Sequence, residues 1–230
     1  TEDLARYPRD PDGDAAKARA RGVDVLFTPT REEVYPREPR VRVVPGALAD
    51  RWEGEVRPGH FAGVLTVVTK LFHLVQPDVA VFGQKDVQQA TLVRALVADL
   101  DVPLELGVAP TVRDPDGLAR SSRNVYLSAD ERARARAIPH ALRAVERAFD
   151  AGERDAARLC AAGMAVLASE PAIAPDYLGL ADPETLDPVA RAERGTVVMV
   201  AARVGRTRLI DNVLLGEPRY GTGIAAAEGA

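Results

Sequence analysis

The sequence lacks several features that would place a protein in a functional class at once. Its 230 residues contain a single cysteine, Cys160, so no disulfide can form within the chain. The three histidines, His60, His73 and His140, are scattered and do not have the spacing of a structural zinc site. We therefore expect neither redox chemistry nor a structural metal.

Long apolar runs and an excess of positive charge are also missing. No stretch approaches the roughly 20 uncharged residues that a membrane-spanning helix needs, and the polar residues 1–14 are unlike a secretory signal. The net charge of -4 argues against general nucleic-acid binding, because that affinity comes from many Lys and Arg contacts to phosphates. We expect a cytoplasmic protein that binds neither membranes nor nucleic acid and holds any anionic ligand at a local positive site.

Apolar residues make up 47% of the chain, enough for a core, and in the first half they follow an alternating pattern of helices and strands. The pattern predicts helices over 14–21, 63–75 and 86–100, and strands over 23–27, 79–82 and 104–108. Such alternation favours a parallel sheet covered on both faces, with ligands at the carboxyl ends of its strands. We therefore predict an α/β fold for residues 1–112.

The pattern changes after Val112. Ser128 and Glu131 have the spacing of a capping box, which predicts a helix start, and helices are expected over 129–169 with an interruption at Pro139. Strands are predicted over 176–180, 196–202 and 207–211, with Gly205-Arg206 turning the last pair. Residues 113–230 are thus expected to form a small α+β domain, of which 216–230 stay unpacked.

One candidate phosphate site lies at 82–89, where a predicted buried strand gives way to a helix. Gly83 lets the backbone approach a ligand, the helix start supplies unpaired amides, and Lys85 adds a full positive charge. These groups suit a nucleotide phosphate. A solvated turn with an ordinary surface lysine fits the same context equally well.

Two further stretches carry donors and cations. Ser121, Ser122 and Arg123 stand side by side in a predicted loop and could surround phosphate oxygens, although alone they fit a flexible linker better. Arg57 and His60 lie on a Pro-Gly turn that could bind a carboxylate or phosphate, or could be a surface turn in which His60 caps a helix.

The remaining histidines and the cysteine are interpreted as structural. His73 and His140 are each isolated within a predicted helix, and Cys160 lies in an Ala-rich helical segment as a small, buried residue.

Six stretches in order resemble the signatures of the pantothenate synthetase family. They are Asp3–Arg9, Arg57–Phe61, Phe82–Asp86, Asp116–Leu118, Ser121–Asn124 and Arg208–Asn212. The resemblance implies a Rossmann-like nucleotidyltransferase domain over 1–112, followed by a lid domain over 113–230, and a homodimer. It also implies a two-step reaction with Mg²⁺ and ATP, in which pantoate is adenylated with release of pyrophosphate and beta-alanine then displaces AMP.

The resemblance assigns roles to individual residues. It implies that Lys85 neutralises charge as pyrophosphate leaves, that Gln89 binds pantoate, and that Val112 lies against the nucleotide. Ser121, Ser122 and Arg123 would act with Lys85 in catalysis. The complete sets are Gly83, Gln84, Lys85, Asp86, Val112, Arg120, Ser121, Ser122 and Arg123 for ATP, and Gln89, Tyr7, Arg57 and His60 for the cavity that binds substrate.

The sequence departs from the family pattern in three places. Arg120 replaces the usual Leu or Met, Val87 replaces a common aromatic residue, and no His-x-Gly-His loop occurs. We expect a fragment that lacks the first, central strand, is unstable or prone to aggregate, and has no activity unaided. The alternatives are a nucleotide-binding remnant without catalysis, or a nucleotidyltransferase of the same superfamily that uses another acid.

Overall fold

The computed structural model describes residues 9–217, so the expectations for Tyr7 and for residues 218–230 lie outside the described part of the chain. The chain divides into two compact units, one that ends at Arg42 and one that begins at Val43. None of the helices within residues 9–217 is both long and apolar enough to cross a membrane.

The described part of the first unit, residues 9–42, contains two short helices, α2 (Pro11–Arg19) and α3 (Arg31–Val34). The predicted helix is confirmed but begins earlier, because Asp10 caps it by accepting a hydrogen bond from the amide of Gly13 at 3.0 Å. The strand predicted over 23–27 is wrong. An apolar run needs a neighbouring strand to satisfy its backbone, and the described residues of this unit contain none.

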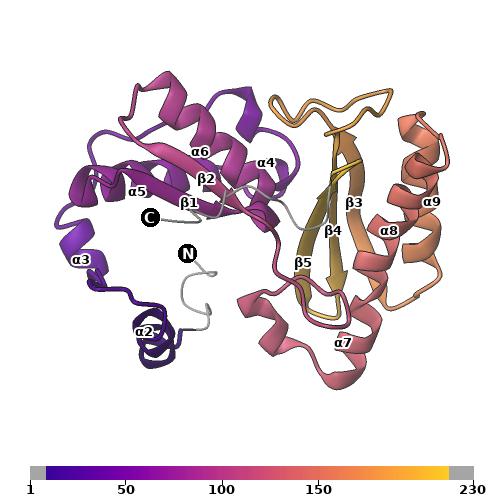
Figure 1. The fold of residues 1–230 in the computed structure, drawn as a ribbon, viewed down its shortest axis with the longest axis horizontal. Coiled ribbons are helices and arrows are strands. Elements are labelled where there is room, and N and C mark those ends of the chain that lie inside the picture. Colours follow the sequence, from indigo (N-terminus) through magenta and orange to yellow (C-terminus); the bar gives the residue numbers. More distant parts are fainter. Residues whose placement is uncertain (1–8, 218–230) are drawn as a thin grey trace, which may run out of the picture. The chain divides into compact units, whose positions relative to one another are not determined.

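The second unit begins with a two-stranded parallel sheet that the sequence predicts correctly. Strands β1 (Val79–Gly83) and β2 (Glu105–Ala109) are parallel neighbours (Figure 1). Along the chain, helix α5 (His60–Val75) precedes β1, and helix α6 (Val87–Asp99) connects β1 to β2. Gln76 adopts a left-handed conformation at the end of α5, just before Pro77. Three shorter helices, η1 (Ala47–Ala49), α4 (Glu53–Val56) and η2 (Gln84–Asp86), complete this half.

The parallel sheet is packed on one face within the described residues. Ala80 and Phe82 pack into a core formed by α5 and α6, and the rings of Phe72 and Phe82 meet edge to face at 6.4 Å. Val79 and Val81 point the other way and remain 53% and 54% exposed. The expectation of a sheet covered on both faces is therefore wrong here, because both helices pack against the same face.

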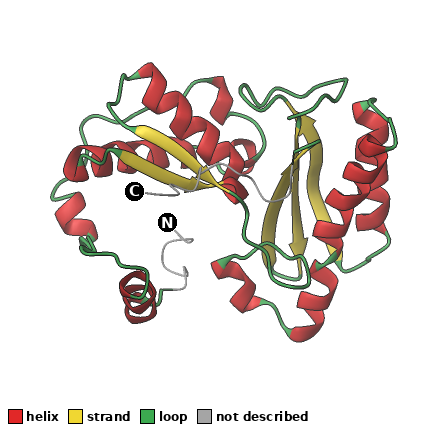
Figure 2. Ribbon diagram, viewed as in Figure 1, coloured by secondary structure: helices red, strands yellow, loops and turns green. Residues whose placement is uncertain are grey.

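The rest of the second unit is an antiparallel sheet with helices (Figure 2). Strands β3 (Ile173–Ala181), β4 (Val197–Val204) and β5 (Thr207–Leu214) pair in the order β3-β4-β5, and Gly205, at φ 56°, turns the last hairpin. The helices are η3 (Ser122–Tyr126), α7 (Ala129–Ala135), α8 (Ala137–Asp150) and α9 (Ala156–Ala168). The predicted small α+β domain and its three strands are confirmed.

Strand β4 is buried on both faces because two sets of side chains cover it. Val198 and Val200 pack against a core that includes residues of α8 and α9, whereas Val197 and Met199 pack with Trp52 on the opposite face. The antiparallel sheet of residues 113–217, the second half of this unit, thus packs against residues 43–112, its first half. The boundary at 112/113 stays a prediction, since residues 43–217 fall within one compact unit.

The local signals for helix starts and stops are also confirmed. Ser128 accepts from the amide of Glu131 at 3.2 Å, and Glu131 accepts from the amide of Ser128 at 2.9 Å. The interruption predicted at Pro139 lies earlier, at Arg136 between α7 and α8. Pro139 is the third residue of α8, a position where an amide proton would have no partner within the helix.

Candidate active site

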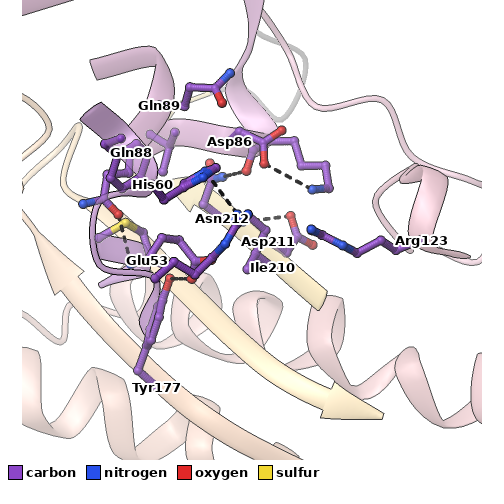
Figure 3. A pocket seen from close by; sticks show the side chains of 15 residues that line it. Glu53, His60, Asp86, Gln88, Gln89, Arg123, Tyr177, Ile210, Asp211 and Asn212 are labelled. Carbon is purple, nitrogen blue, oxygen red and sulfur yellow. Dashed lines mark hydrogen bonds and ion pairs between the residues drawn. The ribbon is translucent and has the colours of Figure 1, made fainter. Parts of the chain in front are cut away.

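A pocket lies where the end of β1 meets β5. Its walls come from α4, the start of α5, the turn into α6, η3, and the strands β3, β4 and β5, and it encloses about 500 Å³ of space that is partly open to solvent (Figure 3). Six residues selected from the sequence line it: Arg57, His60, Lys85, Asp86, Gln89 and Arg123. Residues far apart in the chain thus meet at one cavity.

The turn from β1 into α6 brings Lys85 to this pocket. Gly83 ends the strand, η2 carries Lys85, and α6 follows with its unpaired amides at the same end. The ammonium of Lys85 lies 3.5 Å from the carboxylate of Asp86, and its side chain is only 17% exposed. A full charge and a helix start therefore favour an anion here.

Asn212, on β5, holds this turn from the opposite side. Its side-chain amide donates to the backbone carbonyls of Gln84 and Lys85, each at 2.9 Å. The side chain of Gln84 donates a longer bond of 3.4 Å to the amide oxygen of Asn212. The turn is thus fixed by a residue more than 120 positions away in sequence.

Asp211 and Arg113 form a buried ion pair beside Asn212. The guanidinium of Arg113 donates to both carboxylate oxygens of Asp211, at 2.6 and 2.9 Å, and also to the carbonyl of Asn212 at 3.2 Å. Asp211 is 3% exposed, and its burial raises the pKa of the carboxyl, a shift that the hydrogen bonds from Arg113 oppose. The pair satisfies a charge that would otherwise be costly to bury.

Glu53 forms a second ionic group at the edge of the pocket. It accepts a hydrogen bond from the hydroxyl of Tyr177 at 2.8 Å (Figure 3). It also accepts two hydrogen bonds from Arg208, at 2.5 and 2.8 Å. Arg208 also donates to Asp176 at 2.5 Å. Burial, followed by the negative charge of Glu53, raises the pKa of Tyr177 far above its usual value, so the phenol stays protonated.

The Arg57–Gly59 turn brings Arg57 and His60 together. Gly59 adopts a left-handed conformation, at φ 75°, and His60 is the first residue of α5. One guanidinium nitrogen of Arg57 lies 3.1 Å from Nε2 of His60, and both side chains line the pocket. The structure thus places a cation and an imidazole on the same cavity as the Lys85 turn.

The two glutamines at the start of α6 have different surroundings. Gln88 is buried, donates to the carbonyls of Leu48 and Arg51 at 3.0 and 2.9 Å, and accepts from the amide of Glu53 at 3.1 Å. It therefore fixes the start of α4. Gln89 lines the pocket, and its side-chain amide has no hydrogen-bond partner among residues 9–217, which leaves it available to a ligand.

The loop before η3 approaches the site more loosely. Ser121 and Ser122 line an adjoining shallow pocket with Arg120, whose guanidinium is bound to Asp114 at 2.8 Å. A small cavity lined by both Lys85 and Ser121 lies between this loop and the turn. Figure 3 shows Arg123 reaching from η3 toward Asp211 at the main pocket.

The remaining candidates stand apart from these cavities. Gly83, Gln84 and Val112 line none of the three pockets described, and Val112 is 62% exposed.

Several polar groups of the pocket have no role that the sequence predicts. Glu53, Tyr177, Asp211 and Asn212 line it, and Arg208 binds Glu53 from outside the lining. A signal existed at 211–212, where two adjacent polar residues continue an otherwise apolar strand, although their partners are not visible in a linear sequence.

Two solved structures define the class of protein. Pantothenate synthetase from Thermus thermophilus superposes with a TM-score of 0.88 at 46% identity, covering 94% of this chain and 77% of that one. Pantoate-beta-alanine ligase from Francisella tularensis, complexed with beta-gamma ATP and beta-alanine, gives a TM-score of 0.75 at 30% identity, covering 95% and 75%. The fold is that of a nucleotidyltransferase-like α/β domain followed by a small lid domain.

The sequence comparisons are more specific. Residues 1–214 match the family described as Pantoate-beta-alanine ligase. The pantothenate synthetase of Acidobacterium capsulatum is 52% identical over 216 residues, which cover 94% of this chain and 72% of that protein. The chain belongs to the pantoate-beta-alanine ligase family.

Proposed function

We propose that this protein condenses pantoate with beta-alanine, using ATP and passing through a pantoyl adenylate. The observation that carries the proposal is the convergence of Lys85, Arg57, His60 and Arg123 on one pocket beside a helix start. Four cationic or donor groups around one cavity suit a reaction in which negative charge is transferred between phosphates and a carboxylate. The ATP-bound relative from Francisella tularensis supports ATP as the nucleotide.

In the first step, the pantoate carboxylate attacks the α-phosphate of ATP, and the bond to pyrophosphate breaks. Lys85, nearly buried beside the pocket, neutralises charge as pyrophosphate leaves, assisted by Arg123. Gln89 donates its amide to pantoate. No protein nucleophile is needed, because the residues act by positioning the reactants and by electrostatic stabilisation.

In the second step, the amine of beta-alanine attacks the acyl carbon of the pantoyl adenylate, AMP leaves with the bonding electrons, and the nitrogen releases a proton to solvent. Gly83, Gln84 and Asp86 contact ATP along the turn, while Arg120, Ser121 and Ser122 close over its phosphates from the adjoining pocket. Val112 lies against the nucleotide. Tyr7 would join Arg57 and His60 around the acid substrates.

Magnesium would enter with the phosphates of ATP. Mg²⁺ is usually bound by one or two carboxylates together with substrate phosphates and water. Asp86 is the pocket carboxylate that fits, being half exposed, whereas Glu53 and Asp211 are occupied by Arg208 and Arg113. The ion would supply charge neutralisation, and Asp86 would orient it at the start of α6.

Three broader properties belong to the same proposal. They are a Rossmann-like domain over 1–112 with a lid domain over 113–230, a homodimer formed through the first domain, and a location in the cytoplasm. Light scattering on the purified chain tests the dimer, since a monomeric mass at all concentrations would contradict it.

The test of the reaction is pyrophosphate release that depends on both ATP and pantoate. We expect Lys85→Met to lower the rate by about 10²–10³-fold, as for removal of one stabilising donor. Lys17→Met is the matched control, since Lys17 is an exposed residue of α2 and should leave the rate unchanged. Calorimetric binding of ATP without any pyrophosphate release would instead support a nucleotide-binding protein that lacks catalysis.

A further inference from the structure

We infer that Asn212 is a positioning residue for the adenylation step, because it fixes the turn that carries Lys85. The inference rests on the proposed function for its catalytic consequence and on geometry alone for the contact itself. Asn212 belongs to the antiparallel sheet, so the second half of the unit would contribute to catalysis even where its side chains do not touch ATP.

The contact is built to hold a backbone in place. The two protons of one side-chain amide are directed at two consecutive carbonyls, those of Gln84 and Lys85, each 2.9 Å from the nitrogen. Fixing two successive carbonyls defines the orientation of the two peptide planes on either side of Lys85. The direction of the Lys85 side chain follows from that orientation.

Asn212 is itself held rigidly. Asn212 is 2% exposed. Its backbone N–H donates to the carboxylate of Asp211 at 2.8 Å, and its backbone carbonyl accepts from Arg113 at 3.2 Å. Arg113 and Asp211 therefore fix the backbone from which the Asn212 side chain projects. A buried residue with every polar group paired can locate its partner to within a fraction of an ångström.

The decisive variant is Asn212→Asp, which keeps the shape of the side chain but turns an oxygen toward carbonyls that need a donor. We expect the rate constant for pyrophosphate release to fall about 10²-fold, the usual cost of misplacing a reacting group by about 1 Å. Asn212→Ser, which keeps one donor, should lose less. Thr207→Val changes another buried polar residue of the same strand and should leave the rate constant unchanged.

A double-mutant cycle separates positioning from a general loss of stability. In the Lys85→Met background, Asn212→Asp should cause roughly no further loss, because its effect acts through Lys85. Multiplied losses in the double variant would show that Asn212 acts elsewhere and would overturn the inference.

Amide hydrogen exchange supplies a readout that does not depend on activity. Exchange in the segment 84–90 should become roughly tenfold faster in Asn212→Asp and remain unchanged in Thr207→Val, each with its full 230 residues. If the unmodified protein releases no pyrophosphate, the proposed function fails while exchange still decides the clamp. Unchanged exchange in Asn212→Asp would refute the clamp whatever the activity.

Discussion

The two sheets of residues 43–217 differ in how completely they are buried. In the parallel sheet, β1 leaves Val79 and Val81 more than half exposed. In the antiparallel sheet, all six residues of β4 from Val197 to Ala202 are buried, at 0–3% exposure. The candidate site lies at the end of the parallel sheet, which is exposed on one face. The turn that carries Lys85 is nevertheless held by β5, a strand of the buried antiparallel sheet.

The difference shows how chemistry and rigidity can be divided between two parts of a protein. The parallel sheet supplies the helix start and the lysine, which need access to a ligand. The antiparallel sheet supplies fixed donors such as Asn212, which need burial to stay in place. Substitutions should therefore affect stability more strongly in the second half than at equivalent positions of the first.

The largest expected contrast is between Val200→Asp and Val81→Asp. Val200 is completely buried on β4, so an unpaired carboxylate there should lower the free energy of unfolding by about 5 kcal/mol. Val81 is 54% exposed, and the same change should alter it by less than about 0.5 kcal/mol. Urea unfolding measures both. Equal losses in the two variants would contradict the distinction between the sheets.

A smaller loss is expected for Arg113→Ala, which leaves Asp211 buried without its partner. Removing one member of a buried ion pair typically costs about 3–5 kcal/mol. Arg194→Ala breaks the exposed pair with Glu217 and should cost less than about 1 kcal/mol. If the double variant Arg113→Met, Asp211→Leu recovers most of the stability in urea, the loss comes from the unpaired charge; no recovery would argue against that cause.

Two glycine substitutions should have opposite signs. A Cβ on Gly179 would lie 2.5 Å from the ring of Trp52, so Gly179→Ala should cost about 1–3 kcal/mol through overpacking. Gly63, within α5, has nothing within 4 Å of such a Cβ, and Gly63→Ala should stabilise the helix by about 1 kcal/mol. Thermal melting measures both shifts, and a stabilised Gly179→Ala variant would show that Trp52 can move aside.

The smallest contrast concerns helix caps. Ser128→Ala removes the side-chain acceptor at the start of α7 and should cost about 1 kcal/mol. Asp86 precedes α6 without making a capping hydrogen bond, so Asp86→Ala should change the free energy of unfolding by less than about 0.5 kcal/mol. Urea midpoints compare the two, and equal midpoints would mean that the capping box contributes nothing measurable.

Much of the fold was predictable because local signals agree with the packing. The apolar spacing over 63–75 and the break at Gln76-Pro77 define α5, and the run after it becomes β1 as expected. The capping box at Ser128 likewise predicts α7. By contrast, the apolar run 23–27 satisfies every local criterion for a strand and forms none, because strand formation also requires a partner.

The candidate site was predictable only in part, for a related reason. Lys85 and Arg123 stand out because cations near a helix start or in a serine-rich loop suggest an anion site. Glu53 does not, and Asn212 is noticed only as the end of the Arg208–Asn212 stretch. Their contacts span more than 100 positions, from Asn212 to the turn before α6 and from Glu53 to Arg208. Their roles depend on tertiary pairing, which a single sequence does not encode in any local pattern.

Trp52 gives the molecule an internal optical reporter. It is the only tryptophan in the chain, its indole donates to the carbonyl of Leu186 at 2.9 Å, and its ring lies 5.2 Å from that of Tyr177. Its fluorescence therefore reports on the contact between residues 43–112 and residues 113–217. A red shift that precedes the loss of helical circular dichroism would reveal their separation before either half unfolds.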